Sequence, residues 1–221
     1  MEISIKSLLI FGAAALMVGA MLFVPSGTLG YWQAWMYIGT LFVPMLFALI
    51  YFLAKDPQFL ERRFKTREKE KEQKLVQKLG APLFLISFLL PAFGKRFGWL
   101  DVPAEISIAA DVALLLGYGM VFLVFHENSY AGRTVRVEKG QKTISSGSYA
   151  TVRHPMYAGT VIMFLATPLV LGMYAALIPF LLWLPLLFLR IKNEEEVLKR
   201  ELKGYKEYCK KVKYRLVPGI W

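Results

Sequence analysis

The chain has 221 residues, of which 56% are hydrophobic and 19% are charged, and its formal net charge is +11 at pH 7. This composition, with a mean hydropathy of +0.45, excludes an ordinary soluble domain and indicates a polytopic membrane protein. The basic residues lie between apolar segments, which is typical of loops at a membrane face and not of a nucleic-acid-binding surface.

Six apolar segments follow one another and predict an all-α, polytopic membrane bundle of five to six spans. They are Ser7–Val24, Trp35–Ala54, Gly80–Phe93, Ile106–Phe125, Tyr157–Leu171 and Met173–Leu189. A span needs about 20 apolar residues, a length that suits the first, second and fourth segments. The third, fifth and sixth are shorter. Two arrangements therefore stay open: tilted helices, or a hairpin of the last two that does not fully cross.

The charges between these segments predict the orientation. Residues 25–34 contain no lysine or arginine, whereas residues 55–78 contain nine. The nine are Lys55, Arg62, Arg63, Lys65, Arg67, Lys69, Lys71, Lys74 and Lys78. The positive-inside rule then places both termini, this basic loop and residues 127–153 in the cytoplasm. Within the loop, Pro57–Lys78 is predicted as one helix, either along the membrane surface or as a solvated linker.

The stretch Ser145–Tyr157 lies between a polar segment and an apolar one. Pro155 suits the first turn of a helix, where its missing N–H costs nothing. His154 then lies at the helix entrance, beside backbone N–H groups and the positive end of the helix dipole. The sequence therefore predicts a polar, hydrogen-bonding surface at the mouth of a membrane helix, on the cytoplasmic side.

A second polar cluster, residues 190–196, leaves the sixth apolar segment at the same membrane face. If the helix continues, Arg190 and Glu194 are neighbours at i and i+4. An arginine at an apolar boundary is costly unless it is paired or functional. Two interpretations stay open: a carboxylate that binds an amine or ribose hydroxyls, or an arginine that extends to the interface beside a solvated row of glutamates.

Several familiar sites are excluded. The two histidines lie far apart and there is a single cysteine, Cys209, so the sequence predicts neither a metal site nor an internal disulfide. It also has no P-loop, no Gly-x-Ser-x-Gly elbow and no Gly-x-Gly-x-x-Gly fingerprint. A nucleotide-like cofactor must therefore be held without a Rossmann domain.

Three features together resemble the isoprenylcysteine carboxyl methyltransferase family. They are Arg-His-Pro-Met-Tyr at 153–157, Arg-x-x-x-Glu-Glu at 190–195, and the closing Arg-Leu-Val-Pro-Gly-Ile-Trp at 215–221. More broadly, the chain is similar to integral-membrane methyltransferases that include phospholipid N-methyltransferases. The resemblance covers about the last hundred residues. It implies a transmembrane anchor and lipid-facing bundle over 1–126, with the basic loop at 55–78, and a catalytic region over 127–221.

The resemblance implies S-adenosylmethionine as the cofactor, held on the cytoplasmic side. The implied cofactor-binding residues are Gln141, Lys142, Thr143, Ile144, Tyr149, Arg153, His154, Pro155, Met156, Tyr157, Glu194 and Glu195, and the implied catalytic residues are Arg190 and Glu194. Gln141 is a departure, since eukaryotic members carry a histidine there. Three consecutive glutamates leave the register open by one residue.

The leading hypothesis is methyl transfer to the carboxylate of a lipid-like substrate, such as a prenylated cysteine, that enters from the bilayer. No nucleic acid and no obligate protein partner are expected. One alternative is a phospholipid or other lipid amine as acceptor. Another is an NADPH-dependent sterol-type reductase, in which Arg133, Arg136 and Lys139 would meet the 2′-phosphate. A scaffold or transporter is disfavoured, because Asp111 is the main ionisable residue within a span.

Overall fold

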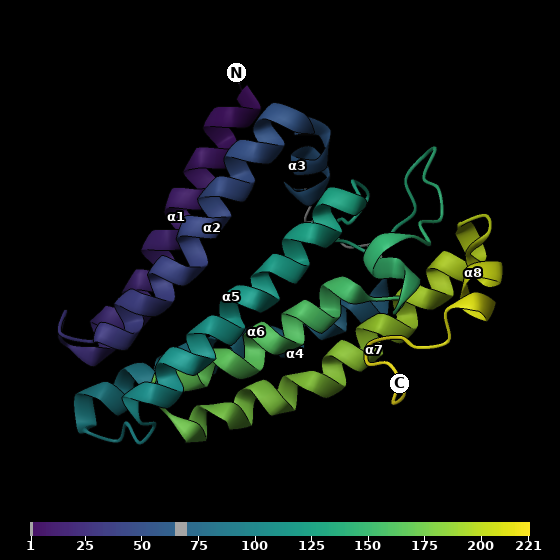
Figure 1. The fold of residues 1–221 in the computed structure, drawn as a ribbon. Helices are drawn as coiled ribbons and strands as arrows, with labels where there is room; N and C mark the ends of the chain where they lie inside the picture. Colours follow the sequence, from purple (N-terminus) through teal and green to yellow (C-terminus); the bar gives the residue numbers. More distant parts are fainter. Residues whose placement is uncertain (1, 65–69) are drawn as a thin grey trace.

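The computed structural model describes residues 2–64 and 70–221, and every regular element in these ranges is helical (Figure 1). The helices are α1 Glu2–Ser26, α2 Trp32–Lys55, α3 Pro57–Phe64, α4 Lys71–Phe97, α5 Ala104–Glu127, α6 Pro155–Val170, α7 Leu177–Glu201 and α8 Tyr205–Lys211, with short 3-10 helices η1 Gly147–Ala150 and η2 Tyr174–Ala176. The predicted all-α bundle is confirmed.

Five helical segments in the described part of the chain are long and apolar enough to cross a membrane. They are Ser4–Ser26, Trp32–Lys55, Lys71–Phe97, Ala104–Glu127 and Tyr174–Glu201. The chain is therefore an integral, multi-pass membrane protein. Of the three segments expected to be short, only the fifth is: α6 has 16 residues, about 24 Å against a hydrocarbon core of about 30 Å. The third and sixth are longer than predicted, because α4 and α7 continue into charged sequence.

The prediction of one helix over Pro57–Lys78 is wrong, because the backbone of Glu70 is extended, with a φ of −70° and a ψ of 131°, and α4 begins after it at Lys71. Gln73 is fully buried, and its Nε2 donates to the Arg190 carbonyl at 3.1 Å and to the Asn193 side chain at 2.7 Å. The first turns of α4 thus pack on α7. Three of the nine basic residues, Lys65, Arg67 and Lys69, lie outside the described residues.

The bundle consists of the α1–α2 hairpin beside a group formed by α4, α5, α6 and α7 (Figure 1). At one end, the Tyr31 hydroxyl donates to the Leu171 carbonyl at 2.5 Å and the Ser107 hydroxyl donates to the Leu169 carbonyl at 2.9 Å. These contacts fix the C-terminal end of α6 against α2 and α5. The opposite end, where α6 begins and α7 finishes, carries α3, α8 and the long connection between α5 and α6 (Figure 1). We call it the cavity end, because a cavity opens there.

Two glycines let α5 and α6 approach closely. A Cβ added at Gly117 would lie 2.9 Å from the Gly159 carbonyl oxygen, and one added at Gly159 would lie 2.8 Å from the Gly117 carbonyl oxygen. Such small-residue contacts are a common way for helices to pack in membranes. The contact fixes the position of α6 and therefore of the residues at its N-terminal end.

Replacing Gly117 with alanine is expected to lower the free energy of unfolding, because overpacking of such a contact usually costs about 1–3 kcal/mol. A gain in helix propensity of about 1 kcal/mol offsets part of this cost. Thermal unfolding in detergent measures the change. Gly119→Ala is the matched control, since no atom lies within 4 Å of a Cβ added there. Equal destabilisation by both variants would contradict the close contact.

Candidate functional site

An open cavity lies at the cavity end, between the α5–α6 connection, the start of α6, the last turns of α7, and α8. Its volume of about 830 Å³ includes space that is open to solvent at the mouth. Among the residues predicted for the site, those that line it are Gln141, Lys142, Thr143, Ile144, Tyr149, Arg153, His154, Pro155, Met156, Tyr157, Arg190 and Glu194.

The start of α6 forms one wall, with Pro155 as its first residue and His154 immediately before it, as expected. Backbone hydrogen bonds hold this entrance to the C-terminal segment. The Arg153 N–H donates to the Tyr214 carbonyl at 3.0 Å, and the His154 N–H donates to the Arg215 carbonyl at 2.9 Å. The predicted polar surface is therefore assembled from two parts of the chain.

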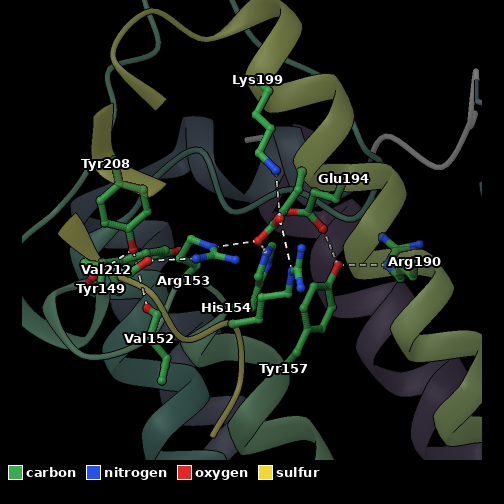
Figure 2. A network of polar contacts seen from close by, with 12 residues as sticks. Tyr149, Val152, Arg153, His154, Tyr157, Arg190, Glu194, Lys199, Tyr208 and Val212 are labelled. Carbon is green, nitrogen blue, oxygen red and sulfur yellow. Dashed lines mark hydrogen bonds and ion pairs between the residues drawn. The ribbon is translucent and has the colours of Figure 1, made fainter. Parts of the chain in front are cut away.

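Glu195, which the resemblance implies as a cofactor ligand, does not line the cavity. Its carboxylate is 1% exposed and lies 2.6 Å from Arg153 Nε, 3.2 Å from Lys199 Nζ and 3.1 Å from Arg215 Nε. Figure 2 shows Arg153 and Lys199 pointing toward this position. Arg153 also donates to two carbonyls of the C-terminal segment, Val212 and Lys213. Glu195 thus joins α7 to the entrance of α6 and to the C-terminal segment.

Glu194 lies at the cavity wall and belongs to a different set of contacts (Figure 2). The Tyr157 hydroxyl donates to Glu194 Oε2 at 2.6 Å and accepts a hydrogen bond from Arg190 Nε at 2.9 Å. Arg190 Nη1 donates to Gln73 Oε1 at 2.8 Å, and Nη2 donates to the Arg133 carbonyl at 2.7 Å. The two predicted catalytic residues are therefore brought together, joined through a tyrosine.

Tyr149 of η1 forms part of the opposite wall. Its hydroxyl accepts a hydrogen bond from Asn128 Nδ2 at 2.8 Å, and its carbonyl accepts one from the Tyr208 hydroxyl at 2.7 Å. Burial raises the pKa of Tyr149 to about 12, so the phenol is neutral at physiological pH. A neutral, fixed aromatic ring of this kind can pack on a planar base or face a cation.

Sequence reasoning missed the residues that fix η1. Glu127, at the end of α5, accepts hydrogen bonds from the Ser148 N–H at 3.0 Å and from the Ser148 hydroxyl at 2.5 Å. Gly147 has a φ of +59°, and an added Cβ would collide with the Glu127 carboxylate. The sequence feature that could have indicated these contacts is the polar run that ends the fourth apolar segment.

The donor and acceptor groups of the cavity fit S-adenosylmethionine, which carries an amine, a carboxylate, hydroxyls and a planar base. Two buried polar atoms on its wall, His154 Nε2 and Tyr205 Oη, make no hydrogen bond within the described part of the chain. His154 Nε2 lies 3.4 Å from Glu195 Oε1, in an ion-pair contact without hydrogen-bond alignment. Nε2 therefore has a contact within the protein, and Tyr205 Oη is the atom of the two whose desolvation a ligand could offset. Glu194 adds an acceptor for an amine or hydroxyls.

Comparison with known proteins identifies similarities to two kinds of enzyme. The family model of phospholipid methyltransferases matches residues 106–204, which run from α5 to the turn before α8 and include most of the cavity wall. A Delta(14)-sterol reductase of Mus musculus is 34% identical over 98 residues, which cover 42% of this chain and 23% of the reductase. The chain thus matches less than a quarter of that relative's length.

The first match supports the resemblance at the level of the integral-membrane methyltransferases, the superfamily that contains both the phospholipid and the isoprenylcysteine enzymes. It does not distinguish between these two families. The isoprenylcysteine family therefore stays a prediction.

Proposed function

We propose that this chain is an integral-membrane methyltransferase that binds S-adenosylmethionine in the cavity and methylates a lipid-like substrate. The single observation that carries the proposal is the meeting of Tyr157, Arg190 and Glu194 on the wall of one cavity. These residues lie inside the stretch that matches the phospholipid methyltransferase model. The positive-inside rule supports a cytoplasmic position for this end of the bundle, where the cofactor would be available.

Four features would hold the cofactor. Glu194 would accept hydrogen bonds from the amine or the ribose hydroxyls, and Tyr149 would pack on the base. The backbone N–H groups at the start of α6 and the positive end of its dipole would favour the carboxylate. Arg153 is already bound by Glu195 and by carbonyls of the C-terminal segment, so its role is to position the wall. When bound, S-adenosylmethionine supplies a methyl group on a positively charged sulfur.

Arg190 would orient the acceptor. Tyr157, Gln73 and the Arg133 carbonyl hold its guanidinium in place, which suits an in-line displacement that depends on positioning. A carboxylate acceptor is ionised at neutral pH and needs no general base. An amine acceptor would need one. Glu195 is enclosed by cations and is unsuited to that role, whereas His154 lines the cavity.

Calorimetry on the detergent-purified protein tests the proposal, with S-adenosylmethionine, S-adenosylhomocysteine and NADPH titrated separately. We expect saturable binding of the first two and none of NADPH. Radiolabelled methyl transfer to a prenylcysteine carboxylate or to a phospholipid amine then separates the two acceptor classes. Failure of both adenosyl compounds to bind would overturn the proposal.

The second candidate is an NADPH-dependent membrane reductase, which the similarity to the mouse sterol reductase favours. Arg136 and Lys142 line the cavity, so basic groups are available for a 2′-phosphate. Arg136 Nη2 lies 2.8 Å from Glu138 Oε1, and this ion pair reduces its availability. Binding of NADPH alone in the titrations above would select the reductase.

A further inference from the structure

The part of the cavity wall beside α8 is apolar and aromatic. Five side chains both line the cavity and pack in one hydrophobic cluster, and we call them the aromatic end: Tyr149, Leu198, Leu202, Tyr205 and Tyr208. Tyr205 is the first residue of α8 and lies one position beyond the stretch that matches the phospholipid methyltransferase model. The residues proposed to hold the cofactor do not include it.

The cavity wall changes in character along α7. Four residues that line the cavity follow one another at four-residue intervals along this helix and at its end: Arg190, Glu194, Leu198 and Leu202. Residues at this spacing lie on one face of a helix, so the wall runs from two charged side chains to two apolar ones. Figure 2 shows the same direction, with Arg190 on one side of Arg153 and Tyr149 on the other. A ligand with a charged part and a flat, less polar part matches this order.

Tyr205 differs from the other two tyrosines of the aromatic end in the state of its hydroxyl. The Tyr208 hydroxyl donates to the Tyr149 carbonyl at 2.7 Å, and the Tyr149 hydroxyl accepts a hydrogen bond from Asn128 Nδ2 at 2.8 Å. Tyr205 is 4% exposed, and its hydroxyl forms no hydrogen bond with residues 2–64 or 70–221. Burial raises the pKa of Tyr205, so the hydroxyl keeps its proton and can donate.

A buried hydroxyl without a hydrogen bond is costly unless a partner is supplied. One candidate partner within the protein is the Cys209 thiol, one turn later on α8, but a thiol is a weak acceptor. Cys209 also does not line the cavity, whereas Tyr205 does. A planar base at the aromatic end would bring ring nitrogens, which are stronger acceptors than a thiol. The position of the hydroxyl therefore favours a ligand as its partner.

We infer that Tyr205 recognises the adenine base of the cofactor, and that its hydroxyl donates a hydrogen bond to a ring nitrogen while Tyr149 packs on the ring. The inference rests on the proposed function and deepens it. It assigns the aromatic end to the base and the opposite end, at Arg190 and Glu194, to the transfer of the methyl group. It also gives α8 a part in cofactor selection, because a base without that ring nitrogen would leave the hydroxyl unpaired.

The test compares Tyr205→Phe with Tyr208→Phe in the full chain in detergent. Calorimetry with S-adenosylhomocysteine measures the affinity, and thermal unfolding of the ligand-free protein measures the stability. We expect Tyr205→Phe to weaken binding about tenfold, the scale of one hydrogen bond. Its melting temperature should stay the same or rise, because it loses no hydrogen bond within the described protein. Tyr208→Phe loses the bond to the Tyr149 carbonyl, so its melting temperature should fall.

Analogues of S-adenosylhomocysteine identify the acceptor. The 1-deaza, 3-deaza and 7-deaza forms each replace one ring nitrogen of the base with carbon. One of the three should bind the native chain about tenfold more weakly than the parent compound, and should bind Tyr205→Phe as well as the parent compound does. If no analogue shows this pattern, the hydroxyl does not bind a ring nitrogen and the inference is wrong.

Two further results separate the inference from its alternatives. Cys209→Ala should bind S-adenosylhomocysteine like the native chain, and a loss as large as that in Tyr205→Phe would mean that the hydroxyl serves the packing of α8. Equal affinity of the native chain and Tyr205→Phe for S-adenosylhomocysteine would also overturn the inference, while leaving the proposed function intact. Failure of the native chain to bind any adenosyl compound would instead fault the proposed function.

Discussion

Replacing Glu195 with glutamine is expected to lower the free energy of unfolding by about 3–5 kcal/mol, the usual cost of removing one partner of a buried ion pair. The change leaves the Arg153 guanidinium, 7% exposed, without its counter-charge. Arginine cannot escape this cost by losing its proton. The C-terminal segment should loosen as well, because Arg215 is attached to the same carboxylate. Denaturant unfolding in detergent measures the loss.

Glu196→Gln serves as the control on the next residue, which is exposed. It should change stability by no more than about 0.5 kcal/mol. If the two variants unfold together, the buried charge cluster is not what holds this end of the molecule. If the Glu195→Gln variant can be isolated in folded form, its cofactor binding should be weakened rather than absent. That result would agree with the position of Glu195 outside the cavity wall.

Replacing Glu194 with alanine is expected to weaken binding of S-adenosylmethionine about tenfold to a hundredfold, the range for losing hydrogen bonds to a charged group. The carboxylate is half-buried at the cavity wall, and the Tyr157 hydroxyl fixes one of its oxygens. Stability should change far less than in Glu195→Gln, because within the described residues Glu194 contacts the Tyr157 hydroxyl and forms no ion pair with a buried cation (Figure 2). Calorimetry measures the affinity. Native affinity in a folded Glu194→Ala protein would remove this residue from the site.

Arg190→Ala separates the acceptor from the cofactor. We expect methyl transfer to fall about a hundredfold or more, the scale of losing one electrostatic contact at a reacting centre. Affinity for S-adenosylmethionine should stay within a few-fold. Initial rates with a saturating cofactor give the first quantity and calorimetry gives the second. Full activity in this variant would exclude Arg190 from the reaction.

The meeting of residues 153–157 with residues 190–194 could be predicted because a membrane hairpin leaves little choice. Two apolar helices joined by a short turn place the start of the first and the end of the second at one membrane face. Any polar residues at those two points must then be neighbours. Which of the three glutamates lies at the cavity was harder to predict. Consecutive residues on a helix point about 100° apart, so only the packing of α7 decides that Glu194 lies at the cavity and Glu195 does not.

Contacts between segments far apart in the sequence were not predictable. Gln73 reads as one polar residue in a charged run, yet it is fully buried against Arg190 and Asn193 of α7. Arg63 reads as one of nine basic residues in a loop, yet its guanidinium contacts Phe125 and Ala131. Net charge and hydropathy average over such residues. Their roles depend on which helix packs against which.

The short length of α6 sets how far the cavity lies below the end of α5. Starting from the contact between Ser107 and Leu169, α5 extends about 30 Å to Glu127, whereas α6 extends only about 21 Å to Pro155. The start of α6, which forms one wall of the cavity, thus lies about 9 Å short of the end of α5. Under the proposed function, a lipid head group at the bilayer surface would reach this level while its chain stays among other lipid chains. A water-soluble cofactor would reach the same level through the open mouth, so neither would have to leave its own phase for the two to meet.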